Sequence, residues 1–66
     1  MKNNLRVERA RLRLIQQELA QQTGVTRQTI VAIEQGRFNP SVILALKMAR
    51  VFNTSVETLF ELETTD

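Results

Sequence analysis

The chain has 66 residues, a formal net charge of +2 and neither cysteine nor histidine. Without these two residue types, disulfides, thiolate nucleophiles, imidazole bases and nearly all transition-metal sites are excluded, and the scattered carboxylates form no evident pair; we therefore expect neither an enzyme nor a cofactor. The length fits one domain over residues 1–66, with one small core whose stability is marginal without a partner subunit.

Turn residues divide the first part of the chain into three short helices, expected over residues 4–12, 16–22 and 26–35. Asn4 and Thr26 have side chains that can cap the first and third of these helices. Gly24 can take the left-handed conformation that ends the second, and Gly36 ends the third. The residues expected to face the core are Leu5, Leu12, Leu19, Ala20, Ile30 and Ile33.

A fourth helix is expected with Pro40 either in its first turn or directly before a Ser41 cap, and it should run to Phe52 with Asn53 as its left-handed stop. Ser55 caps a short fifth helix. The tail over residues 60–65 alternates apolar and acidic residues, which favours a short terminal strand. The predicted fold class is therefore an all-α domain of five helices, with one short C-terminal strand as the only β-structure.

The second and third helices are joined by only three residues, Thr23, Gly24 and Val25, so they must cross steeply in a helix-turn-helix at 16–35. The small Ala20 allows close approach, and Val25 fills the corner. The residues left facing outward on the third helix are Arg27, Gln28, Val31, Ala32 and Gln35.

Charge is distributed unevenly along the chain. Residues 1–37 carry seven Lys or Arg against three Glu, a net charge of +4, whereas residues 38–66 have a net charge of −2. The basic half is where an anionic partner is expected.

No apolar run is long enough to span a bilayer, and no signal peptide is evident, so we expect a cytoplasmic protein without membrane contact. No effector domain fits in this length, so we expect no small-molecule substrate.

Three sequence segments, QQELA at 16–20, TGVTRQTI at 23–30 and IEQGRFNPS at 33–41, resemble the Cro/C1-type (XRE-like) helix-turn-helix family of phage repressors and their bacterial relatives. The similarity covers nearly the whole chain. Its short length is similar to the stand-alone subgroup that includes the cytolysin operon repressor. The resemblance implies a lambda-repressor-like fold and a sequence-specific regulator of transcription that binds double-stranded DNA.

The resemblance further implies that the start of the third helix enters the major groove. Base contacts are then expected from Arg27, Gln28, Thr29 and Ala32, since Arg pairs with guanine, Gln with adenine and an alanine methyl with the thymine methyl. Phosphate contacts are expected from Gln16, Gln17, Thr26, Arg37 and Asn39. The alternative for the polar residues among them is an ordinary solvated surface.

In the family, an arginine of the first helix pairs with a glutamate near the end of the third, which implies a structural ion pair between Arg9 and Glu34. Two positions depart from the family pattern. Arg13 stands where glycine is common, and Ile15 replaces the usual threonine cap of the second helix, so this helix is expected to begin less cleanly. Arg13 is a candidate for an additional phosphate contact or for a solvated side chain.

The fourth helix is too apolar for one packing face. Ala45, Met48, Ala49 and Phe52 suffice for the core, which leaves an apolar stripe for a symmetric dimer interface within residues 42–63, or for cover by the first and fifth helices in a monomer. The predicted interface residues are Leu44, Val51, Phe60 and Leu62. A homodimer binding a palindromic operator, with repression as the outcome, is the favoured function; an antitoxin or a protein-binding adaptor of the same fold is the alternative.

Overall fold

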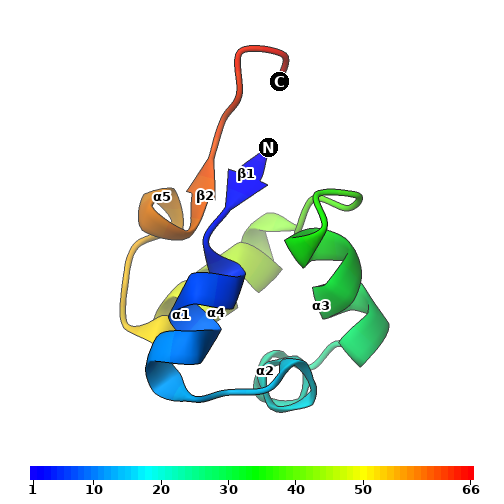
Figure 1. Cartoon of the computed structure of the whole chain (residues 1–66), viewed down its shortest axis with the longest axis vertical. Coiled ribbons are helices and arrows are strands. Elements are labelled where there is room, and N and C mark those ends of the chain that lie inside the picture. The colour runs from blue at the N-terminus through cyan, green and yellow to red at the C-terminus, as the bar shows by residue number, and fades with distance from the viewer.

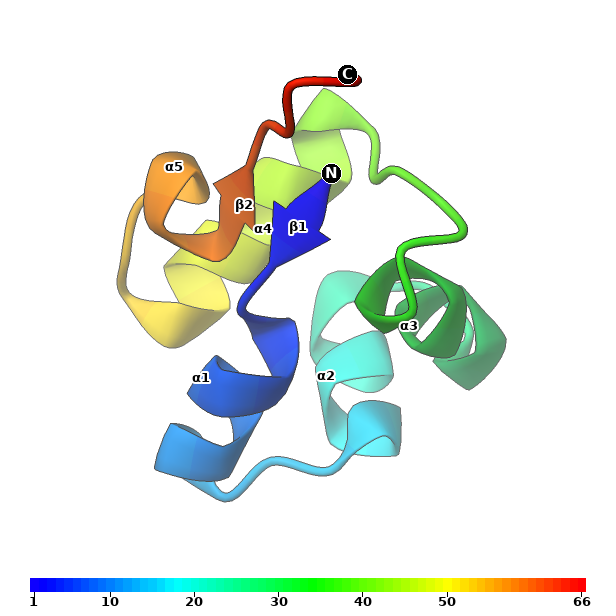
Figure 2. The same cartoon turned by 45° about the horizontal axis from the view of Figure 1, so that its top comes forward.

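The computed structural model describes residues 1–66 and contains five helices and one pair of short strands (Figure 1). The helices are α1 (Leu5–Leu12), α2 (Gln16–Thr23), α3 (Arg27–Glu34), α4 (Val42–Phe52) and α5 (Val56–Leu59), and the strands are β1 (Lys2–Asn3) and β2 (Phe60–Glu61). The predicted five-helix fold with a short C-terminal strand is confirmed. In Figure 1 and Figure 2, α3 and α5 lie on opposite sides of α1 and α4.

Three helices begin with a hydroxyl cap, as predicted. Thr26, Ser41 and Ser55 each precede a helix, and each side-chain oxygen accepts a hydrogen bond from the backbone N–H three residues later, at 3.1 to 3.2 Å. The cap satisfies one of the backbone donors that the first turn of a helix leaves without a partner. These caps fix the starts of α3, α4 and α5.

Left-handed residues follow four of the five helices, and α5 instead continues into extended backbone at Phe60. Gly24, Gly36 and Asn53 have φ values of 76°, 74° and 52°, in agreement with the predicted stops. Arg13, which follows α1, has φ 57°. A side chain with a Cβ atom is strained in this conformation, whereas glycine adopts it freely. The position of Arg13 therefore has a conformational reason to be glycine.

Replacing Arg13 with glycine is expected to stabilise the fold by about 0.5–1 kcal/mol, because relief of the left-handed strain exceeds the added flexibility of the unfolded chain. Thermal unfolding followed by circular dichroism should show a rise in Tm of about 2–8 °C. Arg13→Ala removes the same charge but keeps a Cβ, and it should not raise the Tm. Equal melting temperatures for the two variants would contradict this account.

One cluster of twelve buried apolar residues forms the core. It is made of Leu5, Leu19, Ala20, Ile30, Ile33, Leu44, Ala45, Met48, Ala49, Phe52, Leu59 and Phe60. Two expectations about it were wrong. Leu12, expected in the core, is 39% exposed, because α1 ends there and the chain turns away. Leu44 and Phe60, expected on an exposed dimer interface, are buried in the core instead. Val51 is half-buried and Leu62 is exposed.

The start of the chain pairs with its end. Lys2 lies opposite Glu61 and Asn3 opposite Phe60 in an antiparallel pair, and the N–H of Asn4 donates to the Leu59 carbonyl at 2.8 Å. The prediction that the Asn4 side chain caps α1 was wrong, since its amide donates to the Thr58 carbonyl instead. The strand partner β1 was not predicted, because two residues are too few to show an alternating pattern.

The Met1 ammonium lies over the tail, where it donates a hydrogen bond to Asp66 at 3.2 Å and forms an ion pair with Glu63. These two carboxylates, Asp66 first, raise the pKa of the Met1 ammonium above its usual value. The pKa of Asp66 is lowered, chiefly by the hydrogen bond that its carboxylate accepts from the Glu63 backbone N–H and then by the ammonium.

Candidate nucleic-acid interface

The α2 and α3 helices form the steep pair predicted from the short connection. Ala20 is fully buried where they meet, and the N–H of Val25 donates to its carbonyl at 3.0 Å, which closes the turn. Thr23 is buried, and its hydroxyl donates to the Leu19 carbonyl at 2.7 Å, so no buried polar side-chain atom is left without a partner at the crossing. The pair holds α3 with one face outward.

The outward face of α3 and the loop that follows it enclose a shallow hollow of about 660 Å³. Its lining residues are Arg27, Gln28, Val31, Ala32, Arg37 and Phe38. Arg27 and Gln28, at the start of the helix, are exposed, while Ala32, one turn further on, is half-buried. Three of the four predicted base-contacting residues are therefore brought together with the predicted phosphate contact Arg37, and no carboxylate lines the hollow.

Thr29, the fourth predicted base contact, does not line this hollow. Its backbone N–H donates to the Thr26 hydroxyl at 3.2 Å, and the two hydroxyl oxygens lie 3.0 Å apart. Both threonines therefore take part in the cap of α3. Thr26, predicted as a phosphate contact, has this structural role in addition, and it remains exposed.

Ile15 precedes α2 and has no side-chain acceptor, so the first turn of this helix lacks a hydroxyl cap, as expected. Glu18 satisfies one donor in its place, because its carboxylate accepts a hydrogen bond from the Ile15 N–H at 3.0 Å. Gln17 is exposed beside it. The Gln16 amide donates to Glu34 at 3.2 Å, which still leaves one of its two amide hydrogens for a phosphate oxygen.

Arg9 and Glu34 form a bidentate ion pair that joins α1 to the end of α3. The Nε of Arg9 lies 2.6 Å from Oε2 of Glu34, and its Nη2 lies 3.0 Å from Oε1. The Glu34 side chain is 1% exposed and that of Arg9 is 15% exposed. A third nitrogen of Arg9 donates to the Leu14 carbonyl at 3.0 Å, so one guanidinium ties together three segments.

Further cations and donors compensate the Glu34 carboxylate. Arg6 lies 3.8 Å away, and the Gln16 amide donates to the same oxygen atom. The backbone near it is anchored as well, because the Asn3 amide donates to the Ile33 carbonyl at 2.8 Å. The single carboxylate of α3 is thus buried and paired, and the exposed face of the helix presents only neutral and positively charged side chains.

Sequence reasoning missed Phe38. Its side chain is 53% exposed, whereas Phe52 and Phe60, the other two aromatic residues of the chain, are 1% and 8% exposed. Phe38 lies in the loop with Arg37 and Asn39, of which Asn39 is also exposed. Its exposure could have been inferred from its position directly after the predicted phosphate contact Arg37, in a loop that lacks the periodic apolar pattern of a core-facing segment.

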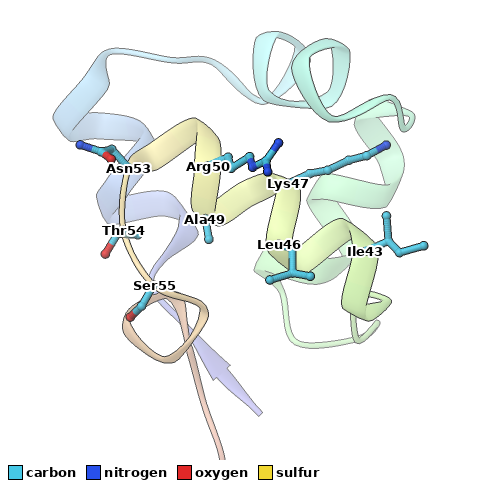
Figure 3. Close-up of a pocket in the computed structure, with 8 residues that line it drawn as sticks. All are labelled: Ile43, Leu46, Lys47, Ala49, Arg50, Asn53, Thr54 and Ser55. Carbon is cyan, nitrogen blue, oxygen red and sulfur yellow. The ribbon is translucent and has the colours of Figure 1, made fainter.

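A second exposed surface lies on α4. Val42, Ile43 and Leu46 are at least half exposed. Figure 3 shows Ile43 and Leu46 projecting from the helix, with Lys47 and Arg50 on the same helix. These four side chains are among those that line a groove of about 730 Å³. The three exposed residues Val42, Ile43 and Leu46 were not among the predicted interface residues.

Comparison with known proteins gives one consistent result. The helix-turn-helix family model HTH_3 matches residues 5–59. An uncharacterized helix-turn-helix transcriptional regulator of Archaeoglobus fulgidus is 50% identical over 60 residues, which cover 91% of this chain and 86% of that protein. The uncharacterized helix-turn-helix regulator YgzD of Bacillus subtilis is 46% identical over 63 residues, covering 96% of both chains.

Solved structures of regulators are similar as well. The restriction-modification controller protein C.AhdI of Aeromonas hydrophila superimposes with a TM-score of 0.77 at 32% identity, covering 85% of both chains. The hypothetical transcription factor NHTF of Neisseria also gives a TM-score of 0.77, at 31% identity, covering 83% of this chain and 62% of that chain. None of the helices in the present structure has both the length and the apolar character needed to cross a membrane.

Proposed function

Because the chain belongs to the Cro/C1-type helix-turn-helix family of transcriptional regulators, we propose that it binds operator DNA by inserting α3 into the major groove. Its family and relatives are regulators, so it is not an enzyme. The observation that carries the proposal is the hollow on α3, where Arg27, Gln28 and Ala32 share one accessible face without a carboxylate.

The chemistry of this face suits the base edges of the major groove. Arg27 can donate two hydrogen bonds to guanine O6 and N7, Gln28 can pair with both N6 and N7 of adenine, and Ala32 can contact a thymine methyl. Arg37 and Asn39 are exposed in the loop that follows α3, and the start of α2 with Gln16 and Gln17 offers backbone N–H groups. Both regions are proposed to contact the sugar-phosphate backbone. Thr29 is retained as a weaker candidate for a base contact, since its hydroxyl is shared with Thr26.

We propose that the protein acts in the cytoplasm as a repressor. A chain of this size that covers promoter DNA needs no further surface to block polymerase. A transcription assay on a template that carries the selected operator tests this role. Repression predicts less transcript as protein is added, and an increase in transcript would assign activation instead.

The proposed binding unit is a homodimer that uses the exposed face of α4. Since Leu44 and Phe60 are buried, the accessible apolar residues are Val42, Ile43 and Leu46, together with the half-buried Val51 and the exposed tail residue Leu62. Lys47 and Arg50 line the groove on α4, and they complement Glu61, which precedes Leu62 in the acidic tail of a second copy; Glu63 pairs with the Met1 ammonium of its own chain. A two-fold arrangement repeats this contact, since each copy offers both a groove and a tail.

A dimer also fits the spacing of DNA. Successive major grooves on one face of the duplex lie about 34–36 Å apart, and a single copy has extents of 31 × 22 × 20 Å. Two copies side by side can therefore place their α3 helices in successive grooves. The operator is accordingly expected to be a palindrome.

The Leu46→Glu substitution should give a monomer, because it places a carboxylate in the centre of the proposed interface, where it would be desolvated without a partner. Sedimentation measured over a series of protein concentrations should show a wild-type dimer and a folded monomeric variant, with operator affinity reduced at least about tenfold. Val7→Glu, an exposed valine of α1, is the matched control and should remain dimeric. If the wild-type protein is a monomer in solution and only one copy binds each operator duplex, the proposed dimer is contradicted.

The proposed function is tested by selection from a pool of random duplex DNA at two salt concentrations. We expect enrichment of a palindrome, with an affinity that falls steeply as salt rises, because phosphate contacts release counterions. A protein that enriches no sequence, and whose binding barely responds to salt, would contradict DNA recognition and direct attention to the apolar face of α4 as a protein-binding surface.

A further inference from the structure

We propose that Phe38 reads a thymine methyl group in the operator and so extends the base-reading surface beyond α3. The inference rests on the proposed function, because it requires α3 in the major groove. Phe38 is 53% exposed and is the one aromatic side chain left outside the core. It lies in the hollow that also contains Arg27 and Gln28.

The backbone fixes the place of Phe38. Gly36 takes a left-handed conformation with φ 74°, and its N–H donates to the Ile33 carbonyl at 3.0 Å. The N–H of Arg37 then donates to the Ala32 carbonyl at 2.9 Å, which holds the chain against the last turn of α3. The residue that follows therefore starts from a fixed point beside α3.

The hollow divides into an apolar part and a polar rim. Val31 and Ala32 are half-buried on α3 and lie with Phe38 among its lining residues, while Arg27, Gln28 and Arg37 supply the charge and the hydrogen-bond donors. No carboxylate lines this surface, so its charge suits an anionic partner. With α3 in the major groove, as proposed above, that partner is duplex DNA.

Among the groups that base edges present in the major groove, the thymine methyl is the apolar one. Phenylalanine and alanine are both side chains that contact it. The apolar patch of Val31, Ala32 and Phe38 inside a polar rim is therefore complementary to an A·T pair whose thymine methyl faces the loop after α3.

The experiment replaces each thymine of the selected operator with deoxyuridine, which lacks only the methyl group, in both half-sites. Kd values are measured for the wild type and for Phe38→Ala. At one half-site position we expect the wild type to lose about threefold to fivefold in affinity per methyl removed. In Phe38→Ala the ratio of the deoxyuridine Kd to the thymine Kd at that position should fall toward one, whereas at the other thymines it should stay unchanged.

Two further variants support the comparison. Phe38→Leu keeps an apolar side chain and should keep part of the methyl preference, while Val7→Ala, an exposed apolar residue on α1, should keep all of it. Circular dichroism confirms that each variant is folded. Since Phe38 is outside the core, its replacement is expected to leave the melting curve nearly unchanged.

The outcomes separate the inference from the function on which it rests. Equal ratios for the wild type and Phe38→Ala at every thymine would overturn the inference while leaving operator binding intact. A uniform loss of affinity on all sites would also overturn it, by assigning the ring to the deoxyribose backbone. If the selection enriches no operator, the proposed function fails first and the role of Phe38 fails with it.

Discussion

The Glu34→Ala substitution is expected to lower the free energy of unfolding by about 3–5 kcal/mol, because it leaves the guanidinium of Arg9 buried without its partner. The Arg9 side chain is 15% exposed, and the carboxylate that it would lose also accepts from Gln16. Domains of this size rarely have more than about 3–5 kcal/mol from their core. The variant should therefore be largely unfolded, as measured by thermal and urea unfolding.

Glu8→Ala is the matched control. Glu8 also pairs with an arginine in a two-bonded contact, at 3.2 and 3.3 Å, but that partner, Arg11, is 53% exposed. An exposed pair contributes about 0–1 kcal/mol, so the control should melt close to the wild type. The double substitution Arg9→Met with Glu34→Leu removes both charges together and should recover part of the lost stability. An unchanged Tm for Glu34→Ala would contradict a structural role for the pair.

The second large effect is expected at the start of α3. Arg27→Ala combined with Gln28→Ala should lower affinity for the selected operator at least about 30-fold, because each bidentate base contact supplies about 1–3 kcal/mol of discrimination. Affinity for unrelated duplex DNA should change much less, since the contacts to phosphate remain. The two measurements together report the specificity ratio, which is the quantity that these residues are proposed to set.

A matched control removes one cation and one glutamine elsewhere. Lys2→Ala with Gln22→Ala changes exposed residues of β1 and α2, and it should leave the preference for the operator intact. Both double variants should melt like the wild type, since none of the four side chains belongs to the core. Equal losses in the two variants would mean that general charge, and not the reading of bases by α3, determines binding.

The helices could be predicted because their ends depend on neighbours in sequence. The caps at Thr26, Ser41 and Ser55 are bonds across three residues, and the left-handed conformation of Gly24 is a property of glycine itself. Asn4 failed as a cap because a competing acceptor, the Thr58 carbonyl, lies 54 residues away. A local pattern contains no information about such a partner.

The same distinction applies to the candidate site. The outward face of α3 followed from helical spacing, which brings Arg27 and Gln28 together on one side. The ion pair of Arg9 with Glu34 joins residues 25 apart and was expected only from the family resemblance. The burial of Leu44 and Phe60 depends on how β2 and α5 return to α4, which the apolar pattern of one helix does not determine.

The strand pair between residues 2–3 and 60–61 has a consequence for the order of folding. It joins the two elements that are farthest apart in the sequence, and closing so long a loop has a large entropic cost that must be met before the contact can form. A nascent chain that has not yet reached Leu59 and Phe60 lacks two core residues and the partner of β1. Helix pairing of α2 and α3 can therefore precede translation of the tail, but the complete domain forms only after residue 60 has left the ribosome.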